Sequence, residues 1–312
     1  MSKAVKIKGS NEDVEISVGN FLRGNFYGFV KSFWSIACGN EPVWNWHIQY
    51  QCDIAEKLVF GIRDKVENPH DIILVNVPPG TSKSIMWSQM LPCWAWTVMP
   101  ELRILCTSYS EEVAFNNSIK RKDILSSARF KKYFPDVVVR NDIARLGKMI
   151  NSKLGEINAY GIGGSITGIH CDLHVHDDPN NASSTDVEMV STQNKFMSCT
   201  TRVANASIAV KVVIQQRLNS MEDLSGWLMG KYKKINHICL PAEYDEETVK
   251  PESAKDFYKD GLLDPVRYNR EVLQTKLLDL GVQRYNAEFL QRVAPADGVI
   301  WKPEYFNVVD DD

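Results

Sequence analysis

The chain has 312 residues, of which 36 are Lys or Arg and 39 are Asp or Glu, so its formal net charge is −3. This length accommodates one large α/β domain, alone or with a small additional unit. Hydrophobic residues make up 44% and charged residues 24% of the chain, which is typical of a soluble globular protein. The slightly acidic balance excludes a protein that coats nucleic acid through its overall charge, although it leaves room for a local basic surface.

Three further observations concern redox state, export and membranes. The seven cysteines are scattered and form no C-x-x-C pair, which favours reduced thiols in a cytosolic compartment over disulfides or zinc. The polar N-terminal stretch does not have the character of a signal peptide. The most apolar run, SIMWSQMLPCWAWTVM, is too short and too polar to span a bilayer.

The elements expected along the chain alternate between helix and strand. Residues 1–20 predict a flexible N-terminal arm, and helical spacing follows over residues 21–61 with a break at CGNEPVW. The run IILVNV is typical of a strand buried on both faces. Beyond it we expect helices at 84–98, 111–133, 185–202 and 224–231, strands at 103–110, 172–178, 208–217 and 235–242, and a strand pair at 149–160.

This alternation predicts an α/β fold with a mostly parallel, doubly wound sheet. After residue 241 the sequence becomes polar and helix-rich. We therefore divide the chain into an arm (1–20), a core domain (21–241) and a small helical lid or linker subdomain (242–312).

The segment VPPGTSKS, at residues 77–84, has the character of a phosphate-binding loop between a strand and a helix. Lys83 and Ser84 stand where such a loop needs an ammonium group for phosphate and a hydroxyl for Mg²⁺. The usual pattern, G-x-x-x-x-G-K-[ST], has glycine where this chain has Val77 and Ser82, although Gly80 gives one adaptable position. A turn that merely ends in Lys-Ser is the alternative interpretation.

Polar side chains end two later strands. Asp177 and Asp178 follow an alternating strand, where ligands bind in open α/β sheets. One acid there would hold Mg²⁺ and the next would polarise a water molecule for attack on the γ-phosphate. A helix-capping turn is the alternative for this pair. Gln216 ends the strand after it and would act as a sensor of the γ-phosphate, unless it is an ordinary polar residue at a strand end.

Several segments, in order, resemble the ATPase half of the large terminase subunit of tailed bacteriophages, the motor that packages DNA. The resemblance covers most of the chain, from about residue 46 to 306. It rests on VNVPPGTSKS as a variant Walker A motif, ILCTSYSEEVAFNNSIKRKDIL, GGSITGIHCDLHVHDDP as Walker B, TTRV…VVIQQRLNSMEDLSGWL as the coupling motif, HICLPAEYD and YNAEFLQRVAPADGVIWKPEYF.

The resemblance implies a P-loop NTPase of the additional-strand (ASCE, RecA-like) type, a three-layer sandwich with ATP and Mg²⁺ as cofactors. The implied catalytic residues are Asp178, Asp177, Lys83 and Gln216, and the implied Mg²⁺ ligands are Ser84 and Asp177. The implied nucleotide-binding residues are Pro79, Gly80, Thr81, Ser82, Lys83, Ser84, Gln51 and His47. Of these, Gln51 in YQCD is similar to the family's adenine-reading glutamine.

The positive charge that stabilises the transition state is missing from its usual place. Terminases often carry an arginine in Walker A or just before the Walker B strand, where this chain has Thr81, Ser82, Ile169 and His170. Our candidates for an arginine finger are Arg202 and Arg217, acting in cis or from a neighbouring subunit. A structural role for both arginines is the alternative.

The function that the resemblance implies is ATP hydrolysis that drives double-stranded DNA into a procapsid. The implied partners are DNA held transiently, a portal protein, a small terminase subunit and further copies of the chain in a ring, with a monomer expected in isolation and no membrane involved. Such a protein would act at the portal in the host cytoplasm. Basic clusters at residues 120–132 and 230–234 are candidates for contact with DNA phosphates, or are solvated helix faces.

Other functions remain as alternatives. The family's nuclease domain is not expected within this chain, so no nuclease activity is expected from it. A helicase-like motor is an alternative, but the residues after 241 are too few for a second RecA-like domain. A P-loop kinase fits less well because Asp178 suits activation of water. A scaffold with a degenerate loop that does not hydrolyse ATP is the alternative from another class.

Overall fold

The structure is a computed structural model of the whole chain and describes residues 11–39, 42–140, 147–164, 166, 168–181, 183–200, 207–218 and 221–293. The predicted arm is wrong over its second half, because helix α1 (Asn11–Arg23) begins within it. Val18 and Leu22 lie four residues apart and pack against the core. The indole Nε1 of Trp94 also donates a hydrogen bond to the carbonyl of Leu22 at 2.9 Å, which anchors the end of α1.

A seven-stranded sheet forms the centre of the molecule, in the order β3-β4-β2-β5-β6-β1-β7. All neighbouring strands are parallel except β3, which is antiparallel to β4. The strands are β1 (Ile72–Asn76), β2 (Arg103–Ser108), β3 (Lys148–Ile150), β4 (Glu156–Gly161), β5 (Leu173–Asp177), β6 (Val210–Gln215) and β7 (Ile235–Cys239). The predicted mostly parallel sheet is therefore confirmed.

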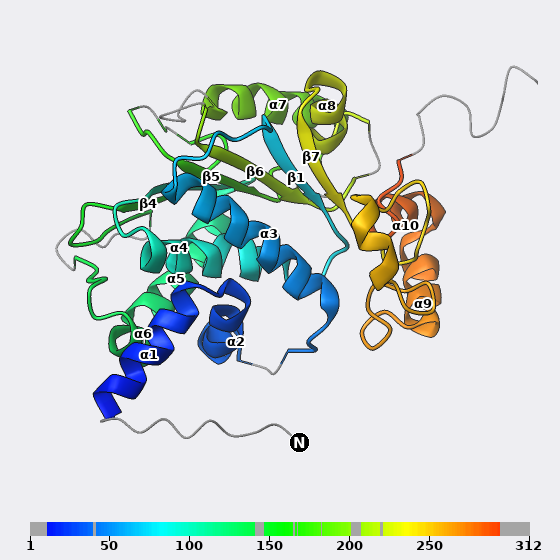
Figure 1. Cartoon of the computed structure of the whole chain (residues 1–312). Coiled ribbons are helices and arrows are strands. Elements are labelled where there is room, and N and C mark those ends of the chain that lie inside the picture. The colour runs from blue at the N-terminus through cyan, green and yellow to red at the C-terminus, as the bar shows by residue number, and fades with distance from the viewer. Residues whose placement is uncertain are drawn as a thin grey trace, which may run out of the picture.

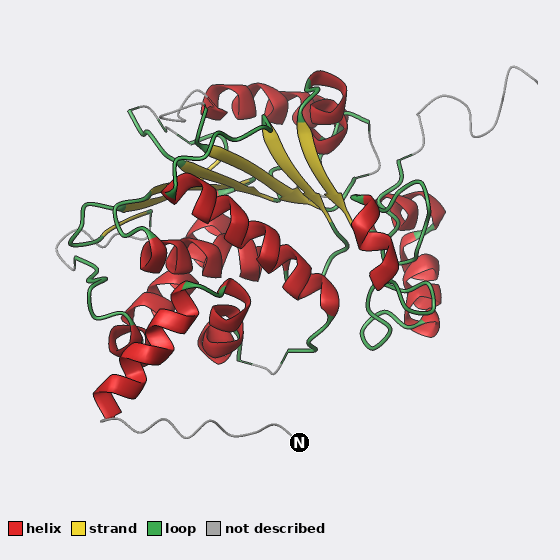
Figure 2. Cartoon of the chain, viewed as in Figure 1, coloured by secondary structure: helices red, strands yellow, loops and turns green. Residues whose placement is uncertain are grey.

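Helices cover both faces of the sheet and make three layers (Figure 1 and Figure 2). One face carries α2 (Phe26–Ala37), α3 (Trp46–Arg63), the π-helix η1 (Ile85–Met90), α4 (Leu91–Val98), α5 (Glu111–Ser126) and α6 (Ala128–Tyr133). The other face carries α7 (Asp186–Thr200) and α8 (Leu224–Lys231).

The sequence of strand β1 is a continuous apolar run because both faces of the strand are buried. Ile73 and Val75 pack in the hydrophobic core beneath α2 to α5, whereas Ile72 and Leu74 pack in the core beneath α7 and α8. All four side chains are fully buried, because both faces of a parallel sheet are covered by helices. This burial fixes the end of β1, and with it the position of the loop that follows.

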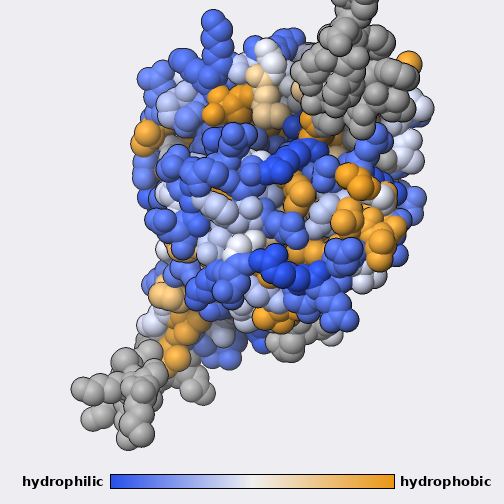
Figure 3. Space-filling model, turned by 90° about the vertical axis from the view of Figure 1, so that its right-hand side faces the viewer, coloured by the Kyte–Doolittle hydropathy of each residue, from blue (hydrophilic) through white to orange (hydrophobic). Residues whose placement is uncertain are grey.

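A small unit follows β7 and contains the 3₁₀-helix η2 (Glu252–Phe257), α9 (Arg270–Leu280) and α10 (Val282–Glu288). Its own hydrophobic cluster includes Tyr268, Leu273, Tyr285 and Phe289. The unit lies at one side of the sheet (Figure 1). Figure 3 shows that side of the molecule as a mainly hydrophilic surface with small hydrophobic areas. Within the described residues, no helix has the length and apolar character needed to cross a membrane.

Candidate active site

The loop after β1 has the backbone conformation of a tight turn that leads into a helix. Gly80 and Ser82 both have positive φ angles, +72° and +65°, and Ser84 has helical angles just before η1. The side chain of Thr81 is buried and donates a hydrogen bond to the carbonyl of Pro78 at 2.7 Å, which closes the turn. The loop therefore presents Lys83 and Ser84 at the start of a helix, where backbone N–H groups and the helix dipole favour an anion.

The end of β5 lies beside this loop. The hydroxyl of Ser84 donates a hydrogen bond to Oδ1 of Asp177 at 2.9 Å, so the two predicted Mg²⁺ ligands are in contact. The other carboxylate oxygen of Asp177 accepts a hydrogen bond from Nδ2 of Asn117 at 3.2 Å. Asp177 is buried, and burial raises the pKa of its carboxyl group. This arrangement fits an acid that holds a metal ion.

The ammonium group of Lys83, from the loop after β1, contacts side chains that follow β5 and β6. Its Nζ lies 3.4 Å from Oδ2 of Asp178 and donates a hydrogen bond to Oε1 of Gln216 at 2.5 Å. Lys83 itself is buried, so its charge acts in a region of low dielectric constant. The structure therefore brings together Lys83, Ser84, Asp177, Asp178 and Gln216, as the sequence predicted.

Asp178 differs from Asp177 in exposure and in backbone conformation. Its side chain is 29% exposed, and its φ is +42°, a conformation that Asp tolerates better than most residues. Burial by the surrounding protein, helped by the neighbouring Asp177 carboxylate, raises the pKa of Asp178 to about 6 despite the opposing effect of Lys83. An accessible carboxylate with this pKa is suited to accept a proton from water near neutral pH.

Asn117 is a site residue that the sequence analysis missed. It lies on α5, and its Oδ1 accepts a hydrogen bond from Nε2 of Gln89 at 2.8 Å while its Nδ2 holds Asp177. The only signal in the sequence was its position inside FNNS, a segment that contributed to the family resemblance. Asn117 fixes the orientation of the buried Asp177 carboxylate.

Two of the predicted nucleotide-binding residues, Gln51 and His47, lie on α3 and are both buried. Gln51 is fully buried, its Oε1 accepts from the indole of Trp87 at 3.1 Å, and its Nε2 donates to the carbonyl of His47 at 3.1 Å. The structure therefore does not expose Gln51 to a ligand. His47 is also buried, and burial lowers the pKa of its imidazole to about 4. His47 is therefore a neutral, buried side chain on α3.

One of the two candidates for the missing positive charge, Arg217, is paired within the fold. Arg217 is buried in an ion pair with Asp223, whose Oδ2 accepts from the guanidinium Nε at 2.8 Å. Asp223 also caps α8, so this ion pair gives Arg217 the structural role that was the alternative interpretation. Arg202 lies outside the described residues.

A different arginine contacts the loop after β1 from outside it. Arg267, from the small unit after β7, donates a hydrogen bond from its guanidinium to the carbonyl of Gly80, and the hydroxyl of the adjacent Tyr268 donates to the carbonyl of Pro79. The cavity beside the loop has a volume of about 270 Å³ and is lined by Trp34, Pro42, Gly80, Ser82, Lys83, Ser84, Ile85 and Arg267. The sequence analysis missed Arg267, which is far from the loop in sequence.

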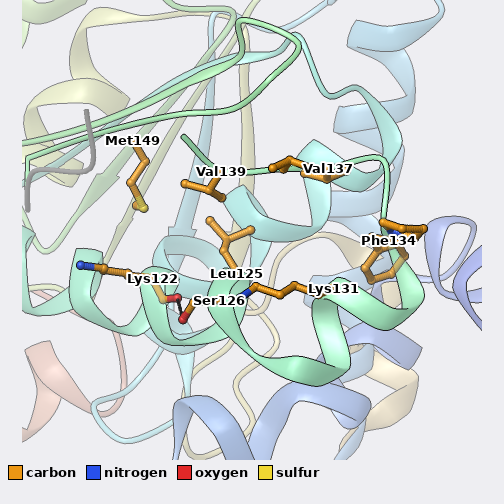
Figure 4. Close-up of a pocket in the computed structure, with 10 residues that line it drawn as sticks. Lys122, Leu125, Ser126, Lys131, Phe134, Val137, Val139 and Met149 are labelled. Atoms are coloured by element: carbon orange, nitrogen blue, oxygen red, sulfur yellow. Dashed lines mark hydrogen bonds between the residues drawn. The ribbon is translucent and has the colours of Figure 1, made fainter. Parts of the chain in front are cut away.

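A larger cavity of about 380 Å³ lies between α5, α6 and the segment that follows them (Figure 4). It is lined mainly by apolar side chains, among them Leu125, Phe134, Val139 and Met149. The described residues that line it include no carboxylate. This cavity therefore does not fit a nucleotide–metal site.

His174 and His176, which alternate along β5, are core residues. Their ring centroids lie 3.8 Å apart with the planes tilted by 34°, and Nδ1 of His176 lies 2.6 Å from the hydroxyl of Thr107. Burial lowers the pKa of His174 to about 3, so this side chain is neutral at ordinary pH. A group of three or more His, Cys, Asp or Glu side chains that could hold a metal is absent from the part of the chain that the structure describes.

The order of the strands defines the class of fold. Strand β6 lies between β1, which carries the phosphate loop, and β5, which carries the two carboxylates. The register pairs Asn76 with Gln215 and Asp177 with Ile214, so the three strands end at the same edge of the sheet. A parallel sheet with this additional strand, and with Lys-Ser at the start of the next helix, is the fold of a P-loop NTPase.

Among solved structures, this fold is similar to that of the large terminase of bacteriophage HK97. The two chains align with a TM-score of 0.52 and 13% sequence identity, over 87% of this chain and 55% of the HK97 chain. The chain thus spans about half the length of the terminase that it matches. The resemblance indicated by the sequence motifs is confirmed at the level of the fold.

Other comparisons give weaker results or none. The large terminase of a thermophilic bacteriophage, in complex with ADP, aligns with a TM-score of 0.45 and 14% identity, over 76% of this chain and 52% of that one. The same terminase in complex with ATP-γ-S aligns with a TM-score of 0.43 and 13% identity, over 76% and 51%. Comparison with protein-family models and with curated proteins finds no match.

Proposed function

We propose that this chain binds ATP at the loop formed by residues 77–84 and hydrolyses it, as the ATPase of a DNA-packaging motor. The observation that carries the proposal is the convergence of Lys83, Ser84, Asp177, Asp178 and Gln216 from the ends of three adjacent strands. A chance turn that ends in Lys-Ser has no reason to meet two carboxylates and an amide at the same edge of the sheet.

Each side chain has a distinct part in the proposed reaction. Lys83 exchanges its contacts with Asp178 and Gln216 for the terminal phosphates of ATP. Asp178 then orients a water molecule and accepts its proton as the water oxygen attacks the γ-phosphorus and the bond to ADP breaks. Gln216 contacts Lys83 directly and is therefore placed to respond when the γ-phosphate leaves.

The donor set beside the loop fits Mg²⁺. The hydroxyl of Ser84 and the carboxylate of Asp177 are hard oxygen ligands in contact at 2.9 Å, and Mg²⁺ is typically held by one or two such groups together with phosphates and water. When bound, Mg²⁺ would neutralise charge on the phosphates. Asn117 would keep the Asp177 carboxylate directed at the ion.

The use of the ATPase to move DNA is supported by the likeness to a large terminase and by the ordered set of motifs. Partners proposed on this basis are double-stranded DNA, a portal protein, a small terminase subunit and further copies of the chain, at the portal in the host cytoplasm. In the basic segment 120–132, Lys120 and Lys122 are exposed, whereas Arg121 is fully buried and donates to the carbonyl of Ser88. Lysines of this segment are therefore the candidates for DNA contact, and Arg121 is not.

The proposal is tested by measuring ATP binding and phosphate release for the purified chain and for Lys83→Ala, with Mg²⁺ and with or without double-stranded DNA. We expect Lys83→Ala to lose both nucleotide binding and phosphate release, because no other described lysine lines the loop cavity. Lys153→Ala removes an exposed lysine elsewhere and serves as the matched control. A folded wild-type chain that neither binds ATP nor releases phosphate at any concentration would favour the scaffold alternative.

A further inference from the structure

The residues around the phosphate loop leave one electrostatic requirement unmet. A triphosphate brings more negative charge than Lys83 can balance, and Lys83 already faces Asp178. Arg217 is committed to Asp223. Among the described residues, Arg267 is the other cationic side chain that lines the loop cavity.

Arg267 is held at the loop by a rigid turn. The buried carboxylate of Asp264 accepts hydrogen bonds through Oδ1 from the backbone N–H groups of Val266, at 3.2 Å, and of Arg267, at 3.1 Å. Such an Asx turn fixes the backbone directly beneath the arginine. The guanidinium is therefore delivered to the cavity by a defined structure.

Tyr268 contacts both the small unit and the phosphate loop. Its ring packs edge-on against Phe289, with centroids 5.6 Å apart, inside the cluster of the small unit. Its hydroxyl reaches the carbonyl of Pro79. At Gly80, an added Cβ would lie 2.7 Å from this hydroxyl, so only glycine permits such a close approach. The small unit thus contacts the phosphate loop through two consecutive side chains.

The backbone carbonyl of Gly80 is a weaker hydrogen-bond acceptor for the Arg267 guanidinium than a phosphate oxygen would be. A guanidinium has five N–H donors in a planar fork that suits phosphate oxygens, and it binds them more strongly than it binds a single carbonyl. In this structure it donates to the carbonyl of Gly80, on the loop that would hold the phosphates. A short displacement of the guanidinium would exchange this carbonyl for a phosphate oxygen.

We propose that Arg267 is the phosphate-contacting arginine of the site, supplied in cis by the small unit after β7, and that it discriminates ATP from ADP through the terminal phosphate. This inference rests on the proposed ATPase function. It answers the absence of arginine at residues 81, 82, 169 and 170, and it makes the contact between the small unit and the loop depend on the bound nucleotide.

The test compares Arg267→Ala and Arg267→Lys with the wild-type chain, measuring kcat and the affinities for ADP and for the slowly hydrolysed analogue ATP-γ-S. We expect Arg267→Ala to lower kcat by about 10²- to 10³-fold, the effect of removing one preorganised donor of this kind. We expect Arg267→Ala to weaken the affinity for ATP-γ-S about tenfold and the affinity for ADP less than about threefold. Arg267→Lys should be intermediate, because it keeps the charge but loses the planar guanidinium group.

Two control variants separate charge from docking. Tyr268→Phe removes the neighbouring contact with the loop but no charge, and Arg270→Ala removes a nearby exposed arginine that donates to the carbonyl of Asp260 at 2.9 Å. We expect both to leave the preference for ATP-γ-S over ADP unchanged. If Tyr268→Phe reproduces the effects of Arg267→Ala, or if Arg267→Ala weakens both nucleotides equally, the arginine serves only to dock the small unit and the inference is wrong.

Mixing experiments test the assignment in cis. An equimolar mixture of Arg267→Ala and Lys83→Ala chains contains no complete site if both residues act in their own subunit, so phosphate release stays at the level of the variants. Recovery in the mixture would show that Arg267 acts on a neighbouring subunit and would overturn the assignment. If the wild-type chain itself is inactive, the proposed function fails; if it is active and Arg267→Ala is equally active, only this inference fails.

Discussion

The pH dependence of ATP hydrolysis should report the ionisation of Asp178. Its pKa lies at about 6 because the surrounding protein desolvates the carboxyl group and Asp177 adds like charge. The group must be ionised to accept a proton, so kcat/KM should fall as the pH falls through about 6. At pH 5 a group with a pKa of 6 is only about 9% ionised, whereas an unperturbed Asp would be about 93% ionised.

The assay is steady-state phosphate release between pH 5 and pH 8, with ATP affinity measured at each pH so that titration of the substrate is separated from titration of the enzyme. We expect kcat/KM at pH 5 to be roughly one tenth of its value at neutral pH. A midpoint near pH 4 would show that Asp178 has an ordinary pKa and would refute the assignment of its environment.

Three further predictions concern stability and metal binding. Asp223→Asn should lower the free energy of unfolding by about 3 kcal/mol in urea titration, because it leaves the buried guanidinium of Arg217 without its counter-charge. Gly19→Ala should lower it by about 1 to 3 kcal/mol, because the new Cβ would lie 2.2 Å from the carbonyl oxygen of Tyr133. Asn117→Ala should raise the Mg²⁺ concentration that gives half-maximal hydrolysis about tenfold, because a support of the metal-binding carboxylate is lost.

Each of these predictions has a control or a contradicting outcome. Gly24→Ala meets its nearest atom at an ordinary 3.7 Å and should change the free energy of unfolding by less than about 1 kcal/mol. If the free energy of unfolding of Asp223→Asn is within about 1 kcal/mol of the wild-type value, the ion pair between Arg217 and Asp223 is effectively solvated. A Mg²⁺ requirement unchanged in Asn117→Ala would place the metal away from Asp177.

The convergence of these side chains at one edge of the sheet was predictable because it follows from strand order. A buried apolar run before Lys83 and Ser84, and an alternating strand before Asp177 and Asp178, each indicate a parallel strand that ends at the same edge of a sheet. The contact of Gln216 with Lys83 follows from the same rule. Local patterns of buried strands therefore carry the information about these positions.

The remaining contacts depend on tertiary packing, which local patterns do not encode. Arg217 ends a strand at the correct edge, yet Asp223, six residues later, captures its guanidinium. Gln51 lies on the expected helix, but the indole of Trp87 directs its amide into the core. Arg267 reaches Gly80 across a separation of 187 residues. Helix α1 was missed because its first turn is polar and its apolar face becomes apparent only against the core.

The central claim is tested most directly by phosphate release from MgATP at neutral pH by the wild-type chain and by Asp178→Asn, with ATP binding measured on the same samples. We predict that the wild-type chain turns over repeatedly, and that Asp178→Asn binds ATP but hydrolyses it about 10²- to 10⁴-fold more slowly, the usual effect of losing a general base. Equal rates of hydrolysis by the two chains would contradict the account.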